Sequence, residues 1–356
     1  MTLVRKACAV AVLALALCGG PAQAATPDGK TVVAVLDTGI NAGHRAFDAD
    51  QVVAWWDFTT GALPEAGQSW DPSRAPYDDN GHGTATASMV AGRTTHWLQS
   101  PSLAPGTKLA VAKVAFADGS VSPQLADAIR WAASTARADV ISMSLGSAAS
   151  DGGGLVLHTE AYAAIQAARE AGILVVVSNG NGTAGMGTVP GDGASRAFSS
   201  SRYALPVGAS GVDAFRNSYQ PEVVADTSVV VPVPDAPAGV RGTEGTSFST
   251  PFVAGFAAAL VAEGCAVGKP LRVARLETLV KYSAEGTEIP PSNEGYGAIT
   301  AARLPAALEH VRAGTLPSRP DPDVDALYVE GVAGPQRMVF SGSTAPDDDP
   351  APRACS

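Results

Sequence analysis

The run Thr31–Leu36 constrains the fold most, because β-branched and apolar residues follow one another there and stop abruptly at Asp37-Thr38-Gly39. Such a run indicates a buried strand with Asp37 at its carboxyl end. Further apolar runs follow along the chain, with helical patterns between them, at residues 108–116, 139–143 and 172–177. This alternation predicts an α/β domain with a doubly wound, mostly parallel sheet and helices on both faces, from about residue 31 to residue 312.

A second motif, Asn-Gly-His-Gly-Thr at residues 80–84, precedes a stretch of small residues that predicts a closely packed helix with His82 at its start. The flanking glycines leave the imidazole uncrowded, so it can accept a proton while a carboxylate orients its other nitrogen. Open α/β sheets place their active sites at the carboxyl ends of strands. Asp37 and His82 are therefore candidate site residues.

Gly245-Thr246-Ser247 opens a third motif, which reaches Pro251 and continues as an apolar segment. This composition predicts a tight turn leading into a helix, because proline is tolerated in the first helical turn. Ser247 is expected at the positive end of that helix, where free backbone amides stabilise an oxyanion formed by attack on a carbonyl. On its own, the run also fits a helix cap with a structural role.

The order Asp37, His82, Ser247, with each residue in its own motif, resembles the subtilisin-like serine proteases, or subtilases. The similarity spans roughly residues 31–308 and includes a closing segment at residues 295–299. The resemblance implies a serine endopeptidase in which Ser247 attacks the peptide bond, His82 shuttles the proton and Asp37 holds the imidazole. Water then hydrolyses the acyl-enzyme.

The resemblance also implies an oxyanion donor just after the apolar run 172–177. Matching Gly180-Asn181 to the family's Gly-Asn pair makes Asn181 the donor, while Asn179, two residues earlier, stays open as an alternative. A side-chain amide suits this role because it donates a hydrogen bond without changing charge.

Two segments are candidates for substrate binding. In subtilases the backbone of a Ser-Leu-Gly segment pairs with the substrate as an added strand, and Ser144, Leu145 and Gly146 match it. Gly154, the last of three glycines at residues 152–154, forms one wall of a substrate pocket or part of a plain flexible turn. Both interpretations of the glycines are open.

Two alternatives to a general endopeptidase remain open. Phe248 and Ser249 stand where Met-Ala is commoner in the family, which favours a reshaped site and a dedicated processing protease for one partner. The other alternative is a non-catalytic homologue that binds peptides in the strand-pairing groove. In each case the expected partners are proteins or peptides.

The N-terminus has the features of a secretory signal peptide. Arg5 and Lys6 precede an apolar stretch, and small residues for cleavage, Ala-Gln-Ala, stand at residues 22–24. The stretch is too short to span a membrane comfortably, and Leu17 disfavours lipid attachment at Cys18. We expect a secreted, extracellular monomer that is not inserted in a membrane.

The predicted domain boundaries are a signal peptide at 1–24, a subtilisin-like peptidase domain at 25–313 and a C-terminal tail at 314–356. Only residues 25–30 separate the predicted cleavage site from the first strand. This leaves no room for the folding-assisting propeptide that many secreted subtilases carry. We expect the domain to fold unaided or with help in trans.

The charge of the chain excludes some partners. It is −10 for all 356 residues, and loss of the two cations Arg5 and Lys6 takes it to −12. A strongly acidic protein is unsuited to bind nucleic acid or anionic lipid. No cofactor is expected.

Residues 41–79 are interpreted as loop-rich, and no metal site is expected there because the acidic residues do not form an alternating calcium-ligand loop. The segment 93–102 also lacks the longer calcium-binding loop of many relatives. Neither His44 nor His96 lies between two glycines as His82 does, and both are interpreted as surface or packing histidines. Three tryptophans line part of the cleft or pack this loop onto the domain: Trp55, Trp56 and Trp70.

Beyond residue 314, prolines alternate with aspartates, which predicts a tail along the domain or a loosely ordered extension. Cys8 and Cys18 leave with the signal peptide, so only Cys265 and Cys355 remain in an oxidising compartment. We predict a disulfide bond between them that fastens the tail. A buried thiol and a free terminal thiol are the alternative.

Overall fold

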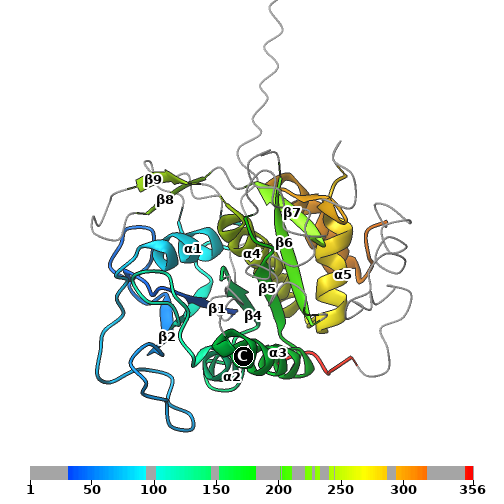
Figure 1. Ribbon diagram of the computed structural model, residues 1–356. Coiled ribbons are helices and arrows are strands. Elements are labelled where there is room, and N and C mark those ends of the chain that lie inside the picture. The colour runs from blue at the N-terminus through cyan, green and yellow to red at the C-terminus, as the bar shows by residue number, and fades with distance from the viewer. Residues whose placement is uncertain are drawn as a thin grey trace, which may run out of the picture.

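The computed structural model describes residues 31–93, 102–145, 152–181, 201, 203–210, 221–226, 229–232, 240–243, 245–286, 294–318 and 349–355. Within them, one sheet has the strand order β10-β7-β6-β5-β4-β1-β3-β2, and every neighbouring pair in it is parallel (Figure 1). Its strands in chain order are β1 (Val32–Asp37), β2 (Val52–Asp57), β3 (Lys108–Lys113), β4 (Val140–Met143), β5 (Leu174–Ser178), β6 (Ala204–Ser210), β7 (Val223–Asp226) and β10 (Ala298–Ile299). The predicted parallel sheet is confirmed.

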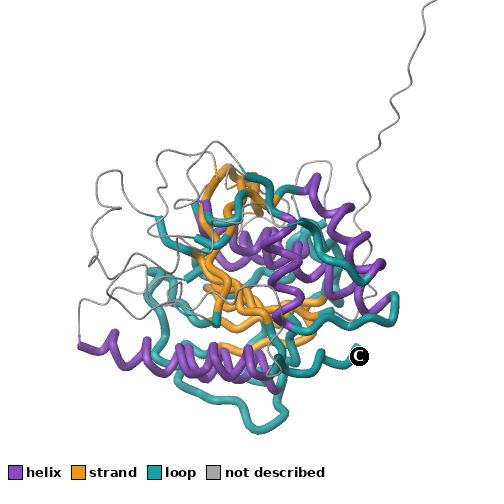
Figure 2. Tube along the Cα trace, turned by 90° about the vertical axis from the view of Figure 1, so that its right-hand side faces the viewer, coloured by secondary structure: helices purple, strands orange, loops and turns teal. Residues whose placement is uncertain are grey.

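Helices cover both faces of this sheet (Figures 1 and 2). They are α1 (His82–Ala91), α2 (Leu125–Ser134), α3 (Gly152–Glu170), α4 (Thr246–Ala266), α5 (Val273–Ser283), α7 (Leu304–Ala313) and the short 3₁₀ helix η1 (Ala301–Arg303). Successive side chains of a strand point to opposite faces. Val33 and Val35 of β1 belong to the buried cluster that includes residues of α1, α4, α5 and α7, whereas Ala34 and Leu36 belong to the cluster that includes residues of α2 and α3. The doubly wound arrangement is therefore confirmed.

Helix α4 lies in the core and contacts β1, β4, β5, β6 and β7. It is long and apolar enough to cross a membrane, but 89% of its most apolar window is buried inside the domain, as expected of a core helix. Gly255 brings it close to α1, because a Cβ at this position would lie 2.8 Å from the Val90 carbonyl oxygen. The two helices therefore pack nearly backbone to backbone.

Strand β2 lies within the stretch that we interpreted as loop-rich, and it pairs with β3 at the edge of the sheet. Trp55 is fully buried and Trp56 is 4% exposed, so both pack the domain core and do not line a cleft. Trp70 is 42% exposed. Strands β6 and β7 and the antiparallel pair β8 (Val229–Pro232) and β9 (Val240–Thr243) were not predicted from the sequence.

The last described residues, 349–355, lie against the domain, at the lower edge of Figure 1. Cys265 near the end of α4 is disulfide-bonded to Cys355, with Cα atoms 5.5 Å apart, so the predicted bond is confirmed. The Asp349 carbonyl oxygen accepts a hydrogen bond from Arg272 Nη1 at 2.5 Å. Residues 1–30 and 319–348 lie outside the described part, and with them the predicted signal peptide and most of the tail.

Candidate active site

Asp37 and His82 meet at the carboxyl edge of the sheet. Asp37 is the last residue of β1 and is fully buried, while His82 opens α1 and keeps 27% of its side chain exposed. His82 Nδ1 lies 2.7 Å from Asp37 Oδ1. The Thr38 N–H donates to Asp37 Oδ1 at 2.7 Å, and the Thr86 hydroxyl donates to Oδ2 at 3.0 Å. These contacts hold the carboxylate in one orientation toward the imidazole.

Two glycines allow this close approach. A Cβ on Gly83 would lie 2.2 Å from the Gly39 carbonyl oxygen, much closer than nonbonded atoms come. Gly39 itself has a φ of +118°, which side chains of L residues rarely adopt. The backbones that follow Asp37 and His82 therefore pack directly against each other, which explains why each motif contains a glycine.

Ser247 lies in the first turn of α4 and is half-buried. Its carbonyl oxygen accepts a hydrogen bond from the Ser144 hydroxyl at 2.8 Å, which ties the start of α4 to the end of β4. The next residue, Phe248, has its ring centroid 5.7 Å from that of His82. The structure therefore brings the third predicted residue to the same edge of the sheet as the Asp37–His82 pair.

Asn181 follows β5 by three residues and is exposed. Its Oδ1 accepts hydrogen bonds from both the N–H and the hydroxyl of Thr246, each at 2.8 Å. Because Thr246 immediately precedes Ser247, the side-chain amide is oriented beside the serine. Asn179, the alternative donor, is only 1% exposed. Exposure and position therefore favour Asn181 as the residue that a bound substrate reaches.

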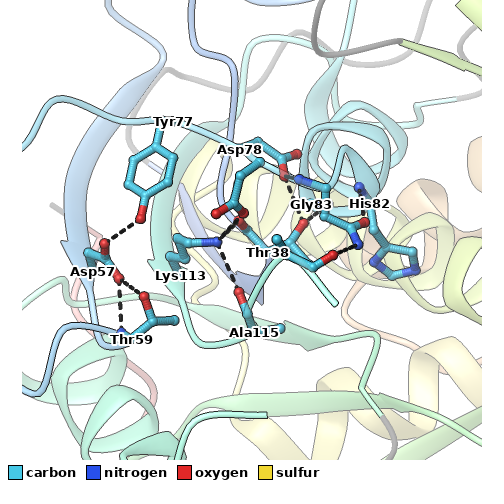
Figure 3. A network of polar contacts seen from close by, with 12 residues as sticks. Thr38, Asp57, Thr59, Tyr77, Asp78, His82, Gly83, Lys113 and Ala115 are labelled. Atoms are coloured by element: carbon cyan, nitrogen blue, oxygen red, sulfur yellow. Dashed lines mark hydrogen bonds and ion pairs between the residues drawn. The ribbon is translucent and has the colours of Figure 1, made fainter. Parts of the chain in front are cut away.

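Asp78 anchors the loop before α1, a role that we did not predict. Its carboxylate accepts hydrogen bonds from the hydroxyls of Thr38 at 2.9 Å and Thr84 at 2.6 Å, and from the Gly81 N–H at 2.8 Å. Burial raises the pKa of Asp78, but the hydrogen bonds outweigh it and keep the pKa below its usual value. One carboxylate thus joins the residue after Asp37 to residues on both sides of His82. Figure 3 shows Asp78 beside Thr38.

Lys113, the last residue of β3, carries a buried ammonium group beside the carboxyl end of β1 (Figure 3). Its side chain is 1% exposed. Nζ donates hydrogen bonds to the carbonyl oxygens of Thr38 at 2.7 Å and Ala115 at 3.0 Å, and to Asp79 Oδ1 at 2.6 Å. Three acceptors therefore match the three ammonium hydrogens, and the charge lies buried without loss of hydrogen bonding.

Tyr77 continues this network toward the edge of the sheet (Figure 3). Its hydroxyl donates to Oδ2 of the buried Asp57 at 2.7 Å, and its ring centroid lies 5.1 Å from Lys113 Nζ. Burial and then the hydrogen bond to Asp57 raise the pKa of Tyr77 to about 12, so the phenol stays protonated at neutral pH. Polar contacts thus connect β2 with the loop that precedes His82.

The candidate substrate-binding residues are only partly described. Ser144 and Leu145 directly follow β4 and are buried, and the Leu145 carbonyl oxygen accepts a hydrogen bond from Ser178 at 3.3 Å. Gly146 lies outside the described residues. Gly154 lies in the first turn of α3, so the flexible-turn interpretation of residues 152–154 is wrong: the triplet is helical. A role for these residues in substrate binding stays a prediction.

No group of three or more His, Cys, Asp or Glu side chains placed to hold a metal ion occurs among the residues that the structure describes. His44 is 2% exposed, and its Nδ1 accepts a hydrogen bond from the Ala46 N–H at 3.1 Å, so it is a packing histidine. His96 lies outside the described residues.

An aspartate, a histidine and a serine near the carboxyl edge of a parallel α/β sheet is an arrangement that one class of serine hydrolases shares. Residues 28–297 match the Subtilase family, and the chain belongs to this family. The resemblance carried by the three motifs is therefore confirmed.

Relatives in the family align with most of the chain. It is 29% identical over 263 residues to the thermophilic serine proteinase of Bacillus sp. (strain AK1), in a match that covers 72% of this chain and 58% of the relative. It is 28% identical to thermitase of Thermoactinomyces vulgaris, with 72% and 83% covered. Subtilisin Savinase of Lederbergia lenta is 31% identical, with 64% and 75% covered. The chain thus spans somewhat more than half of the first relative.

Proposed function

We propose that this chain is a secreted serine endopeptidase with Ser247, His82 and Asp37 as its catalytic triad. The observation that carries the proposal is the 2.7 Å contact between His82 Nδ1 and Asp37 Oδ1, beside the first turn of the helix that holds Ser247. Family membership supports it, as does the relative from Bacillus sp. (strain AK1), which is a serine proteinase by name.

In the proposed reaction, the Ser247 hydroxyl attacks the carbonyl carbon of the scissile peptide bond while His82 Nε2 takes the hydroxyl proton. Asp37 accepts the hydrogen bond from Nδ1–H and stabilises the imidazolium. His82 then gives the proton to the leaving amine, and the acyl group stays on Ser247 as an ester. A water molecule that His82 deprotonates hydrolyses this ester and restores the free serine.

Asn181 and the Ser247 backbone N–H are the proposed oxyanion donors. Support comes from the two 2.8 Å hydrogen bonds that Thr246 donates to Asn181 Oδ1, because they fix the amide plane before the substrate arrives. A donor that is already oriented needs no reorganisation when negative charge develops on the carbonyl oxygen. The first turn of α4 adds the partial positive charge of a helix N-terminus.

We further propose that an extended substrate pairs with the backbone of Ser144, Leu145 and Gly146. The hydrogen bond from the Ser144 hydroxyl to the Ser247 carbonyl supports this, since it fixes the distance between the pairing segment and the nucleophile. Main-chain pairing grips peptides of any sequence, and side-chain pockets then select among them. Gly154 is proposed as part of one pocket wall.

The proposed location is extracellular, on the basis of the signal peptide expected at residues 1–24. The proposed peptidase domain covers residues 25–313, and the family match over residues 28–297 lies inside it. A charge of −10 for the full chain supports protein or peptide substrates over nucleic acid. The mature protein is proposed to be a monomer.

Digestion of a proteome-derived peptide library by the protein from residue 25 onward, read by mass spectrometry, tests the proposal. We expect many cuts, and expect them to disappear in Ser247→Ala. A few closely related cuts would instead identify a dedicated processing protease, the alternative that Phe248 and Ser249 in place of the commoner Met-Ala favour. Peptide binding with no cleavage by either protein would contradict the proposed activity and identify a binding module.

A further inference from the structure

Phe248 directly follows the proposed nucleophile and packs against the proposed general base. Its side chain is 3% exposed, and its ring lies at 53° to the His82 imidazole with the centroids 5.7 Å apart. Aromatic pairs attract each other at centroid distances of about 4.5–7 Å in inclined arrangements of this kind. The contact is therefore a specific one between rings.

Asp37 holds the imidazole at Nδ1. Rotation about the Cβ–Cγ bond of His82 would move Nε2 away from Ser247, and a ring packed against the imidazole limits this rotation. Phe248 has two rotatable bonds and belongs to the same buried cluster as Met89 and Phe252, so its position is set by the core. It therefore adds a fixed contact to the imidazole.

The contact also acts on charge. A cation within about 6 Å of an aromatic ring centroid is attracted to the π electrons of that ring. His82 becomes a cation each time it takes the proton of Ser247. An aliphatic side chain of similar size would fill the same space but would not attract the imidazolium.

We propose that Phe248 is a positioning residue for His82, which holds the imidazole toward Ser247 and stabilises its protonated form. The inference rests on the proposed function, because both effects presuppose proton transfer between Ser247 and His82. It gives a physical role to the residue that stands where methionine is commoner in the family.

The other charges around His82 stay constant when residue 248 is replaced by a neutral side chain. Helix α1 has no ionisable residue after His82, and α4 has none before Glu263. Among the described residues, the charged groups on neighbouring elements include Asp37 on β1, Asp78 and Asp79 in the loop before α1, and Lys113 on β3. A change in the titration of His82 would therefore report the loss of the aromatic ring.

Phe248→Leu and Phe252→Leu form a matched pair. Phe252 lies one turn further along α4, is 7% exposed and belongs to the same cluster, so both substitutions remove one buried ring from one helix. We expect both to lower the melting temperature. Only Phe248→Leu should lower kcat, by about tenfold with little change in KM, and move the acid-side midpoint of kcat/KM downward by about 0.5 pH unit. Phe248→Tyr, which keeps the ring, should restore both values.

A second readout does not depend on activity. In the Ser247→Ala protein, NMR titration of the His82 imidazole should show a lower midpoint with Phe248→Leu and an unchanged midpoint with Phe252→Leu. Equal midpoints in the two variants would overturn the inference, even if the wild-type protein cleaves peptides. Absence of Ser247-dependent cleavage would overturn the proposed function instead, while the titration would still measure the contact between the rings.

Discussion

At the scale of single residues, hydrogen bonds to one atom decide what the other atom of a side chain can do. Thr246 occupies Oδ1 of Asn181 with two hydrogen bonds, so the amide nitrogen is the part that is presented as a donor. Asp37 is constrained in the same way, because Thr38 and Thr86 each fix one of its oxygens. In the proposed reaction, preorganisation of this kind would let the site stabilise charge without rearranging.

Asn181→Ala tests the oxyanion donor. We expect kcat to fall by roughly 10²–10³-fold with KM nearly unchanged, the scale known for loss of one such donor in subtilisin. Asn179→Ala is the matched control and should affect thermal stability more than kcat, because Asn179 is buried. If steady-state kinetics showed the large loss in kcat for Asn179→Ala instead, the assignment of the donor would be wrong by two positions.

The catalytic candidates could be predicted from the sequence because each lies in a local motif whose glycines or proline have a clear structural cause. The network behind them could not. Lys113 Nζ bonds to the Thr38 carbonyl, 75 positions away in the sequence, and to Asp79, 34 positions away. No local sequence pattern around these residues predicts the contacts. In the sequence, Asp78 is only one acidic residue among several, since its anchoring role depends on where Thr38 and Thr84 lie in the folded chain.

At the scale of elements, a cluster of buried charges joins α3, α5 and the start of β7. Glu277 of α5 is paired with Arg169 of α3 and with Lys281 one turn later, and Lys281 Nζ also lies 2.8 Å from Glu222 Oε2. Burial raises the pKa of Glu277, but the charges of Arg169 and Lys281 outweigh it and hold the pKa at about 2. The carboxylate therefore stays ionised well into acid.

A folded-state pKa below the ordinary value of 4.5 means that ionised Glu277 stabilises the fold above pH 4.5, and that this stability is lost as pH falls toward 2. Glu277→Gln should lower the free energy of unfolding by about 3 kcal/mol at pH 7 and by clearly less at pH 3. Urea unfolding at both pH values measures this. Glu285→Gln, at a side chain that is 60% exposed, is the control and should have little effect. An equal loss at both pH values for Glu277→Gln would contradict the account.

The central strands could be predicted because β1, β4 and β5 are buried on both faces and consist of continuous apolar runs. Strand β2 was harder, since an edge strand with a tryptophan pair between long loops has no such run. Strand β10 has only two residues and is defined by its pairing with β7, a contact between segments far apart in the sequence. Local patterns carry no information about such pairings.

At the scale of the whole molecule, the tail is fastened far from the site. Cys265 follows Ser247 by 18 positions on one continuous helix, which corresponds to about 27 Å at 1.5 Å per residue. Asp349 adds a second attachment, because its Oδ1 accepts a hydrogen bond from the Ala274 N–H in the first turn of α5 at 3.3 Å. The tail end is therefore attached to the domain at the end of α4 opposite to Ser247.

Cys355→Ser should therefore lower stability and leave kcat/KM nearly unchanged. The disulfide joins two residues separated by 90 positions in the sequence. On the chain-entropy model, closing a loop of this length raises the free energy of unfolding by up to ~4–5 kcal/mol. Thermal unfolding measures the loss, and Cys265→Ser should match it if the bond itself matters. Addition of two alkyl groups to the denatured, unreduced protein from residue 25 onward, seen by intact mass, would show instead that both thiols are free.

Calcium should contribute little to stability. A metal that binds only the folded state raises the melting temperature, and the described residues contain no cluster of acidic or histidine ligands for one. We expect melting curves with and without a chelator to coincide. A large fall in melting temperature on chelation, reversed by calcium, would reveal a site built from residues distant in the sequence.

The central claim is that Ser247 is a nucleophile activated by His82 and Asp37, and covalent labelling tests it most directly. The protein from residue 25 onward is treated with a fluorophosphonate, which reacts with activated serines, and the modified peptide is located by mass spectrometry. The account predicts one adduct, on Ser247, that disappears in Ser247→Ala and forms far more slowly in His82→Ala. An adduct elsewhere, or labelling of Ser247 at an equal rate without His82, would contradict it.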